Sequence, residues 1–108
     1  MKRIAKSAAR RLSRADAQRG LREAMEHGTV EQHPHFKRSL ADDDLSYSDI
    51  LPILNKGLVL NEPEFNVRFQ QWRYTVEGRA VDGQQVAVVF AFLEDGTLLI
   101  TAFVLRRE

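Results

Sequence analysis

Two Asp-Gly pairs near the C-terminus constrain the fold of this chain more than any other feature. Asp82-Gly83 and Asp95-Gly96 each separate runs of apolar or alternating residues. A tight hairpin needs a positive φ angle, which Gly adopts at no steric cost, so Asp-Gly between such runs favours a β-hairpin. The pattern predicts strands over about residues 67–80, 84–93 and 97–106. We therefore expect the chain to end in an antiparallel meander.

The predicted strands differ in their side-chain pattern. Residues 84–93 and 97–106 are apolar on both faces, as in central strands that are covered on both sides. The strand over 67–80 alternates, with one face made of Trp72, Tyr74 and Val76 and the other of Arg73, Thr75, Glu77 and Arg79. Leu58–Leu60 is predicted to add a first short strand, followed by a loop over 61–64. Helices cover one sheet face, so the other is expected to be an exposed apolar patch.

Three helices are predicted ahead of the meander. The first covers about 14–27, with Ser13 and Asp16 as its N-terminal cap and Gly28 ending it in the left-handed conformation. His33-Pro34 opens the second, which the run Asp42-Asp43-Asp44 ends as a solvated cap. Ser46 and Asp49 form the capping box of the third, which closes at Gly57. The predicted fold is α+β, with the helices packed on a four-stranded antiparallel meander.

Composition narrows the classes of function. The chain has 108 residues, enough for one domain, and no Cys, which excludes thiolate catalysis and Cys-ligated metals. No apolar run reaches the length of about 18 residues that spans a bilayer, and the N-terminus lacks the apolar segment of a secretory signal. We expect a bacterial-type cytoplasmic protein without contact to a membrane.

The charge is divided between two parts of the chain. Residues 1–22 carry a net charge of +7, whereas the remainder carries −6. We divide the chain into a basic arm, 1–12, and one α+β domain, 13–108. A basic arm indicates a polyanionic partner such as nucleic acid, and its candidate contacts are Lys2, Arg3, Lys6, Arg10, Arg11 and Arg14. A solvated terminus is the alternative, and a mitochondrial transit peptide ranks third.

Several short motifs resemble one known family. They are His35-Phe36, the stretch Leu45–Gly57, the stretch Arg73–Arg79, and Ile100-Thr101 in the last strand. Over about residues 30–105 the chain resembles the bacterial domain of unknown function family 4258. That family is similar, at the level of fold, to the RelE-like and BrnT-like ribonuclease toxins of toxin–antitoxin pairs. The resemblance implies a RelE-like fold, an endoribonuclease activity, RNA or the ribosome as target, and a cognate antitoxin-like partner.

One departure from the family pattern lies in the second predicted helix. Ser39 stands where the family usually has Arg, and Asp42-Asp43-Asp44 replaces an acid-Arg-Gly turn. Arg38 is displaced by one residue, which rotates it by about 100° around a helix. If that Arg is catalytic in the family, this chain is weakened or inactive.

The chain holds residues for metal-independent RNA cleavage, which needs a proton acceptor for the 2′-OH and cations around the phosphate. His35 is the candidate base, since histidine titrates near neutral pH. Arg73 and Arg79 are candidate phosphate ligands, Glu77 is an alternative base, and Tyr74 is a candidate proton donor or stacking partner. Lys37, Arg38 and Arg68 are further candidate phosphate contacts.

Other interpretations of the same residues remain open. His33 and His35 could cap a helix, and Arg73 and Arg79 could solvate a strand. Two His residues at this spacing converge on a metal from a strand but not from a helix, and no third ligand is evident, so we expect no metal and no cofactor. The alternative function is a non-catalytic binding module that holds a protein or nucleic acid through the apolar sheet face or the basic arm.

Overall fold

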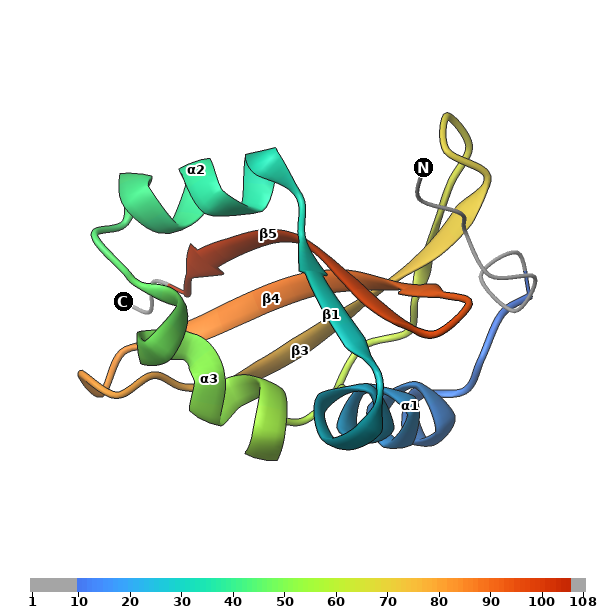
Figure 1. Ribbon diagram of the computed structural model, residues 1–108, viewed down its shortest axis with the longest axis horizontal. Helices are drawn as coiled ribbons and strands as arrows, with labels where there is room; N and C mark the ends of the chain where they lie inside the picture. The colour runs from blue at the N-terminus through green and yellow to red at the C-terminus, as the bar shows by residue number, and fades with distance from the viewer. Residues whose placement is uncertain (1–9, 106–108) are drawn as a thin grey trace.

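The computed structural model describes residues 10–105, which form three helices and five strands. The helices are α1 (Arg14–His27), α2 (Pro34–Asp42) and α3 (Tyr47–Lys56). The strands are β1 (Thr29–Gln32), β2 (Glu64–Asn66), β3 (Gln71–Arg79), β4 (Gln85–Leu93) and β5 (Gly96–Val104). They form one sheet in the order β1-β5-β4-β3-β2 (Figure 1).

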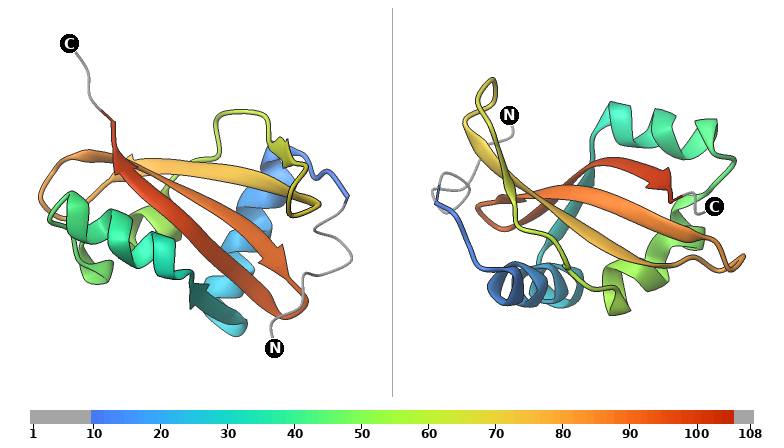
Figure 2. Two further views of the ribbon diagram at one scale, coloured as in Figure 1. Left: turned by 90° about the horizontal axis from the view of Figure 1, so that it is seen from above. Right: turned by 180° about the vertical axis from the view of Figure 1, so that it is seen from behind.

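The helices gather on one face of the sheet and leave most of the opposite face without a helix (Figure 2, left). The main core lies between these layers. It unites Leu21 of α1, Phe36 of α2 and Ile50 of α3 with Val88 and Phe90 of β4, all fully buried. A second, smaller cluster on the open face consists of Ala91, Leu93, Leu98 and Ile100. These four residues are at most 9% exposed, whereas Phe103, which lies on the same face, is 43% exposed, so only part of the predicted apolar patch reaches the surface.

The α+β class and the three helices are confirmed, but the sheet differs from the predicted meander. β3, β4 and β5 are consecutive antiparallel neighbours, with β4 central as expected. β1 adds a fifth strand that pairs in parallel with β5. β5 also carries a bulge, since Val89 pairs with Thr101 and Phe90 with Leu99. Ile100 is therefore the extra residue, which lets apolar side chains of β5 serve both faces.

Gly96 has a different role from the predicted one. Among the glycines of residues 10–105, only Gly83 has a positive φ, of 90°. Gly96 lies opposite Thr29 in the β1–β5 ladder, and a Cβ there would come within 1.8 Å of the Thr29 carbonyl oxygen. Gly96 is required for close approach of β1, not for the turn geometry.

Local capping signals predicted the helix boundaries well. Ser13 Oγ accepts from the Asp16 N–H, and Ser46 with Asp49 forms the reciprocal capping box. The predicted left-handed ending at Gly28 is wrong, because Gly28 is extended, with φ −107° and ψ −167°. Gly28 instead leads directly into β1, and a Cβ there would lie 2.6 Å from the Asp95 carbonyl oxygen.

The segment between α3 and β3 was predicted incorrectly. Leu58–Leu60 is not a strand, since only Leu58 forms an isolated bridge, to Glu77. β2 forms within and after the predicted loop, and its residues pair with the first residues of β3. Residues 67–70 make a turn in which Gln70 has a φ of 52°, so β3 begins at Gln71. Three apolar residues are too few to show a strand or helix periodicity, so the conformation of such a run depends on its tertiary contacts.

The acidic run after α2 is not simply a solvated cap. Asp43 Oδ2 accepts a hydrogen bond of 3.1 Å from the Val104 N–H of β5. No helix within residues 10–105 is long and apolar enough to cross a membrane.

Candidate functional site

A cavity of about 270 Å³ opens on the sheet face that the helices leave uncovered. We call it the His–Arg cavity, and it is lined by His33, His35, Phe69, Gln71, Arg73, Leu98 and Ile100. Leu98 and Ile100 belong to the smaller apolar cluster of the sheet. The cavity therefore combines an apolar floor with a few convergent polar groups, the usual composition of a ligand site.

The two histidines come from the start of α2. His33 is the N-cap residue, and its Nδ1 accepts a hydrogen bond of 3.0 Å from the His35 N–H. The His33 N–H donates to the Leu99 carbonyl oxygen at 2.9 Å, which ties this helix end to β5. Because Nδ1 is an acceptor, the neutral His33 ring carries its proton on Nε2. Pro34 at the first helical position holds the intervening backbone in helical geometry.

Arg73 enters the cavity from β3. Its Nε donates to Gln71 Oε1 at 3.0 Å, and its guanidinium carbon lies 5.3 Å from the centre of the Phe69 ring. Burial lowers the pKa of Arg73 from its ordinary value, yet a guanidinium stays charged at neutral pH. A half-buried cation held by two neighbours attracts an anion more strongly than a solvated one does.

The other predicted catalytic residues lie elsewhere. Tyr74 is fully buried in the main core, where its hydroxyl accepts from the Leu12 N–H at 3.0 Å. Arg79 donates to the Gly83 carbonyl oxygen at 2.9 Å, in the turn that leads to β4. Glu77 accepts from Asn61 at 3.4 Å. Of the predicted cluster, the structure thus brings together only His35 and Arg73. The other three residues do not line the His–Arg cavity.

Two arginines of the predicted nucleic-acid set are engaged with the body of the domain. Arg11 pairs with Glu62, and its guanidinium carbon lies 5.7 Å from the centre of the Trp72 ring. Arg14 contacts the same carboxylate at 3.2 Å and donates to the Leu60 carbonyl oxygen at 2.9 Å. The structure attaches the end of the basic arm to the loop before β2.

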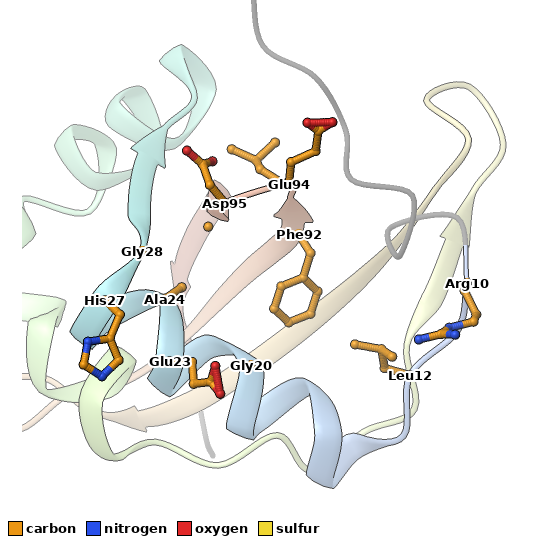
Figure 3. Close-up of a pocket in the computed structure, with 12 residues that line it drawn as sticks. Arg10, Leu12, Gly20, Glu23, Ala24, His27, Gly28, Phe92, Glu94 and Asp95 are labelled. Atoms are coloured by element: carbon orange, nitrogen blue, oxygen red, sulfur yellow. The ribbon is translucent and has the colours of Figure 1, made fainter.

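The remaining residues of that set are dispersed. Lys37 and Arg38 are exposed on α2, and the guanidinium carbon of Arg68 lies 5.3 Å from the centre of the Phe69 ring. Arg10 lines a separate cavity of about 480 Å³ between α1 and the β4–β5 turn, into which Phe92 points (Figure 3). Lys2, Arg3 and Lys6 lie outside the described residues.

The cavity of Figure 3 is distinct from the His–Arg cavity. Its labelled acids are Glu23 on α1 and Glu94 and Asp95 at the β4–β5 turn. Gly20 makes room for that ring, since a Cβ there would lie 2.9 Å from it. No group of three His, Cys, Asp or Glu side chains able to hold a metal ion occurs in residues 10–105.

Sequence reasoning missed Phe69 and Gln71 as site residues. Gln71 precedes Arg73 by two positions, so strand alternation places both on one face and is the signal that could have found it. Phe69 lies in the turn before β3, so strand alternation does not apply to it. Only the tertiary structure places Phe69 at the cavity.

A third cavity, of about 510 Å³, adjoins the His–Arg cavity at Arg73, which lines both. We call it the β2 cavity. Its lining is Asn61, Glu62, Glu64, Phe65, Asn66, Arg73, Thr75, Val89, Thr101 and Phe103. Arg73 is therefore shared by the His–Arg cavity and the β2 cavity.

A family model described as a domain of unknown function, DUF4258, matches residues 32–104. The chain belongs to the DUF4258 family. The expected family membership is thereby confirmed, and the matched segment of this DUF4258 domain contains every residue of both cavities. No curated protein and no solved structure matches the chain.

Ser39 has a structural role in this DUF4258 domain. Ser39 lies on α2, where its hydroxyl bonds to the Phe36 carbonyl oxygen at 2.7 Å and to the Ala102 N–H at 3.0 Å. Neither Ser39 nor Arg38 lines the His–Arg cavity. The serine therefore has a role in packing α2 against β5.

Proposed function

We propose that this domain is a metal-independent endoribonuclease whose site is the His–Arg cavity. One observation carries the proposal. His35, from the first turn of α2, and Arg73, from β3, line the same cavity although they are far apart in the chain. Cleavage of a phosphodiester by its own 2′-hydroxyl needs this pairing of a proton acceptor with a fixed cation.

Each residue has a distinct role in the proposed reaction. Arg73 binds the scissile phosphate, and the N-terminal end of α2 adds its partial positive charge. His35 accepts the proton of the 2′-hydroxyl, whose oxygen attacks phosphorus. The bond from phosphorus to the 5′-oxygen breaks, leaving a 2′,3′-cyclic phosphate, and the departing oxygen takes a proton from water.

The apolar part of the cavity supports an RNA substrate. Phe69 is 53% exposed and lies beside the guanidinium groups of Arg68 and Arg73, so it offers apolar ring surface to a nucleobase next to two cations. Aromatic rings stack unpaired bases of single-stranded RNA with little dependence on sequence. Single-stranded RNA is thus the substrate class that we propose.

Cleavage by purified protein tests the proposal. RNA is incubated with the wild type in EDTA, alone and with ribosomes, and the products are examined for cyclic phosphate ends. His35→Ala and Arg73→Ala should each lower the rate by roughly 10²-fold or more. Arg79→Ala is the matched control, because it removes the same charge from the same strand at a position that bonds the Gly83 carbonyl oxygen.

Two results would contradict the assignment. Full activity of a folded His35→Ala protein would remove His35 from the mechanism. Absence of cleavage by the wild type under both conditions would favour the binding module. The toxin–antitoxin setting is a separate proposal, tested by inducible expression with growth and RNA integrity followed together, and by whether a small antitoxin-like gene lies next to this one.

A further inference from the structure

The β2 cavity differs in chemistry from the His–Arg cavity. Its polar lining contains the carboxylates of Glu62 and Glu64, which only accept hydrogen bonds, and the amides of Asn61 and Asn66 and the hydroxyls of Thr75 and Thr101, which both donate and accept. Two carboxylates repel a phosphate group. Such a cavity instead suits a neutral group that offers N–H donors, placed beside an anion held by Arg73.

The two carboxylates are not equivalent. Glu62 is paired with Arg11 and Arg14, so its oxygens are already engaged. Glu64 lies directly opposite Arg73 in the β2–β3 ladder, which places both side chains on the same sheet face. Within residues 10–105 Glu64 forms no ion pair, and Arg73 bonds to Gln71 instead. Glu64 is therefore the carboxylate available to a ligand.

We propose that the β2 cavity binds the guanine base of the nucleotide whose phosphate Arg73 holds, with Glu64 as the residue that selects it. The inference rests on the proposed function, since it supplies the base preference of that ribonuclease. Guanine presents two neighbouring donors, N1–H and the N2 amino group, to the two oxygens of one carboxylate.

The other bases cannot make this pair. Adenine and cytosine place an acceptor ring nitrogen next to their amino group, so one carboxylate oxygen would face a lone pair. Uracil offers a single N–H between two carbonyl oxygens. A carboxylate placed to accept from two neighbouring donors favours the base that satisfies both of its oxygens.

The apolar residues of the cavity complete the base site. Phe103 is 43% exposed and Val89 packs against the apolar cluster of the open face. Both line the cavity together with Phe65, so a planar base has apolar surface beside its polar edge. The volume of about 510 Å³ accommodates a purine.

Binding of mononucleotides tests the selection without cleavage. Affinities of guanosine and adenosine 3′- and 5′-monophosphates are measured by calorimetry for wild type, Glu64→Gln and Glu62→Gln. Wild type should bind one guanosine monophosphate roughly 5- to 150-fold more tightly than its adenosine counterpart. Glu64→Gln should abolish the preference, because a carboxamide pairs with the N1 and N6 atoms of adenine and equally with the N1 and O6 atoms of guanine. Glu62→Gln should change both affinities by the same factor.

The outcomes separate this inference from the ribonuclease proposal. Equal affinity of the wild type for guanosine and adenosine monophosphates, or an unchanged ratio in folded Glu64→Gln, would overturn the guanine subsite even if RNA is cleaved. A guanine preference that is lost in Glu64→Gln supports the subsite even if no RNA is cleaved. In an active enzyme, sequencing of cleavage ends should show guanine at one position beside the cut in the wild type, and Glu64→Gln should lose this preference for guanine over adenine.

Discussion

The N–H of Ala102 in β5 donates a hydrogen bond of 3.0 Å to the side-chain oxygen of Ser39 in α2. Two residues further along β5, the Val104 N–H donates to Asp43, which is one helical turn beyond Ser39. Four helical residues rise about 6 Å and two strand residues about 6.6 Å, so the two spacings match. β1 pairs with β5 only over residues 96–99. Beyond that point, Ser39 of α2 and Asp43, the residue that follows α2, provide acceptors for the donors of β5.

Ser39→Ala should therefore destabilise the domain. The change leaves the Ala102 N–H without its acceptor in a half-buried position, which costs about 1–3 kcal/mol of unfolding free energy. Urea denaturation measures the loss. Ser48→Ala is the control, since Ser48 is exposed and contacts only Ser46 Oγ. Equal midpoints for the two variants would show that the Ser39 bond contributes nothing.

Phe90→Ala should cost about 3–5 kcal/mol, because a fully buried ring is removed and a cavity remains. The ring centre of Phe90 lies 5.7 Å from that of Tyr74 and 5.5 Å from that of Phe92. Phe103→Ala, at a position 43% exposed on the other face, should cost clearly less. Thermal or denaturant unfolding of the pair checks this, and a larger loss for Phe103→Ala would contradict the assignment of the core.

Gly96→Ala should detach β1. The added methyl group would overlap the Thr29 carbonyl oxygen, whereas a Cβ at Gly83 meets no atom within 4 Å. Gly83→Ala should then cost only the strain of its positive φ, about 1–2 kcal/mol. Hydrogen exchange of residues 29–32 should accelerate in Gly96→Ala and stay slow in Gly83→Ala. Equal exchange rates in the two variants would be inconsistent with the β1–β5 contact.

Tyr74 should ionise at unusually high pH. Burial raises the pKa of Tyr74, opposed by the Leu12 N–H and the charge of Arg11. Burial also raises the pKa of Tyr47, the other tyrosine, so a Tyr47→Phe protein isolates the Tyr74 signal. A phenol whose pKa is raised by folding contributes stability that is complete below about pH 10 and lost as pH rises through the folded value.

Absorbance near the tyrosinate band checks this directly in Tyr47→Phe. Native protein should titrate above the same protein in denaturant, and its unfolding free energy should fall as the pH rises above about 10. Coincident native and denatured curves would place Tyr74 in solvent.

Much of the candidate site was predicted from the sequence, but not its boundaries. His35 and Arg73 were identified by chemistry and strand alternation, and the structure places them on one cavity. The same alternation predicts that Tyr74 lies on the face opposite Arg73, and the structure agrees. Tyr74 is therefore not available as the predicted catalytic residue. Its hydroxyl is held inside the core by the Leu12 N–H, a contact between residues far apart in sequence.

Glu64 and Phe69 were missed for a related reason. The sequence predicts a loop at Glu64, because the three residues of β2 carry no periodic signal. Only the pairing of β2 with β3 makes Glu64 a neighbour of Arg73. Phe69 lies in a turn that interrupts the predicted strand. Neither position can be read from nearby residues, since each depends on a partner that the fold supplies.

The sequence by itself determined the elements whose signals are local. Ser13, Pro34 and the Ser46–Asp49 box start the three helices, because each satisfies or avoids backbone donors within its own first turn. Only the tertiary structure decided that 29–32 is a strand, that it runs parallel to β5, and that Leu58–Leu60 is not one. Such short segments gain their hydrogen bonds from distant residues, so their conformation depends on which sheet edge is within reach.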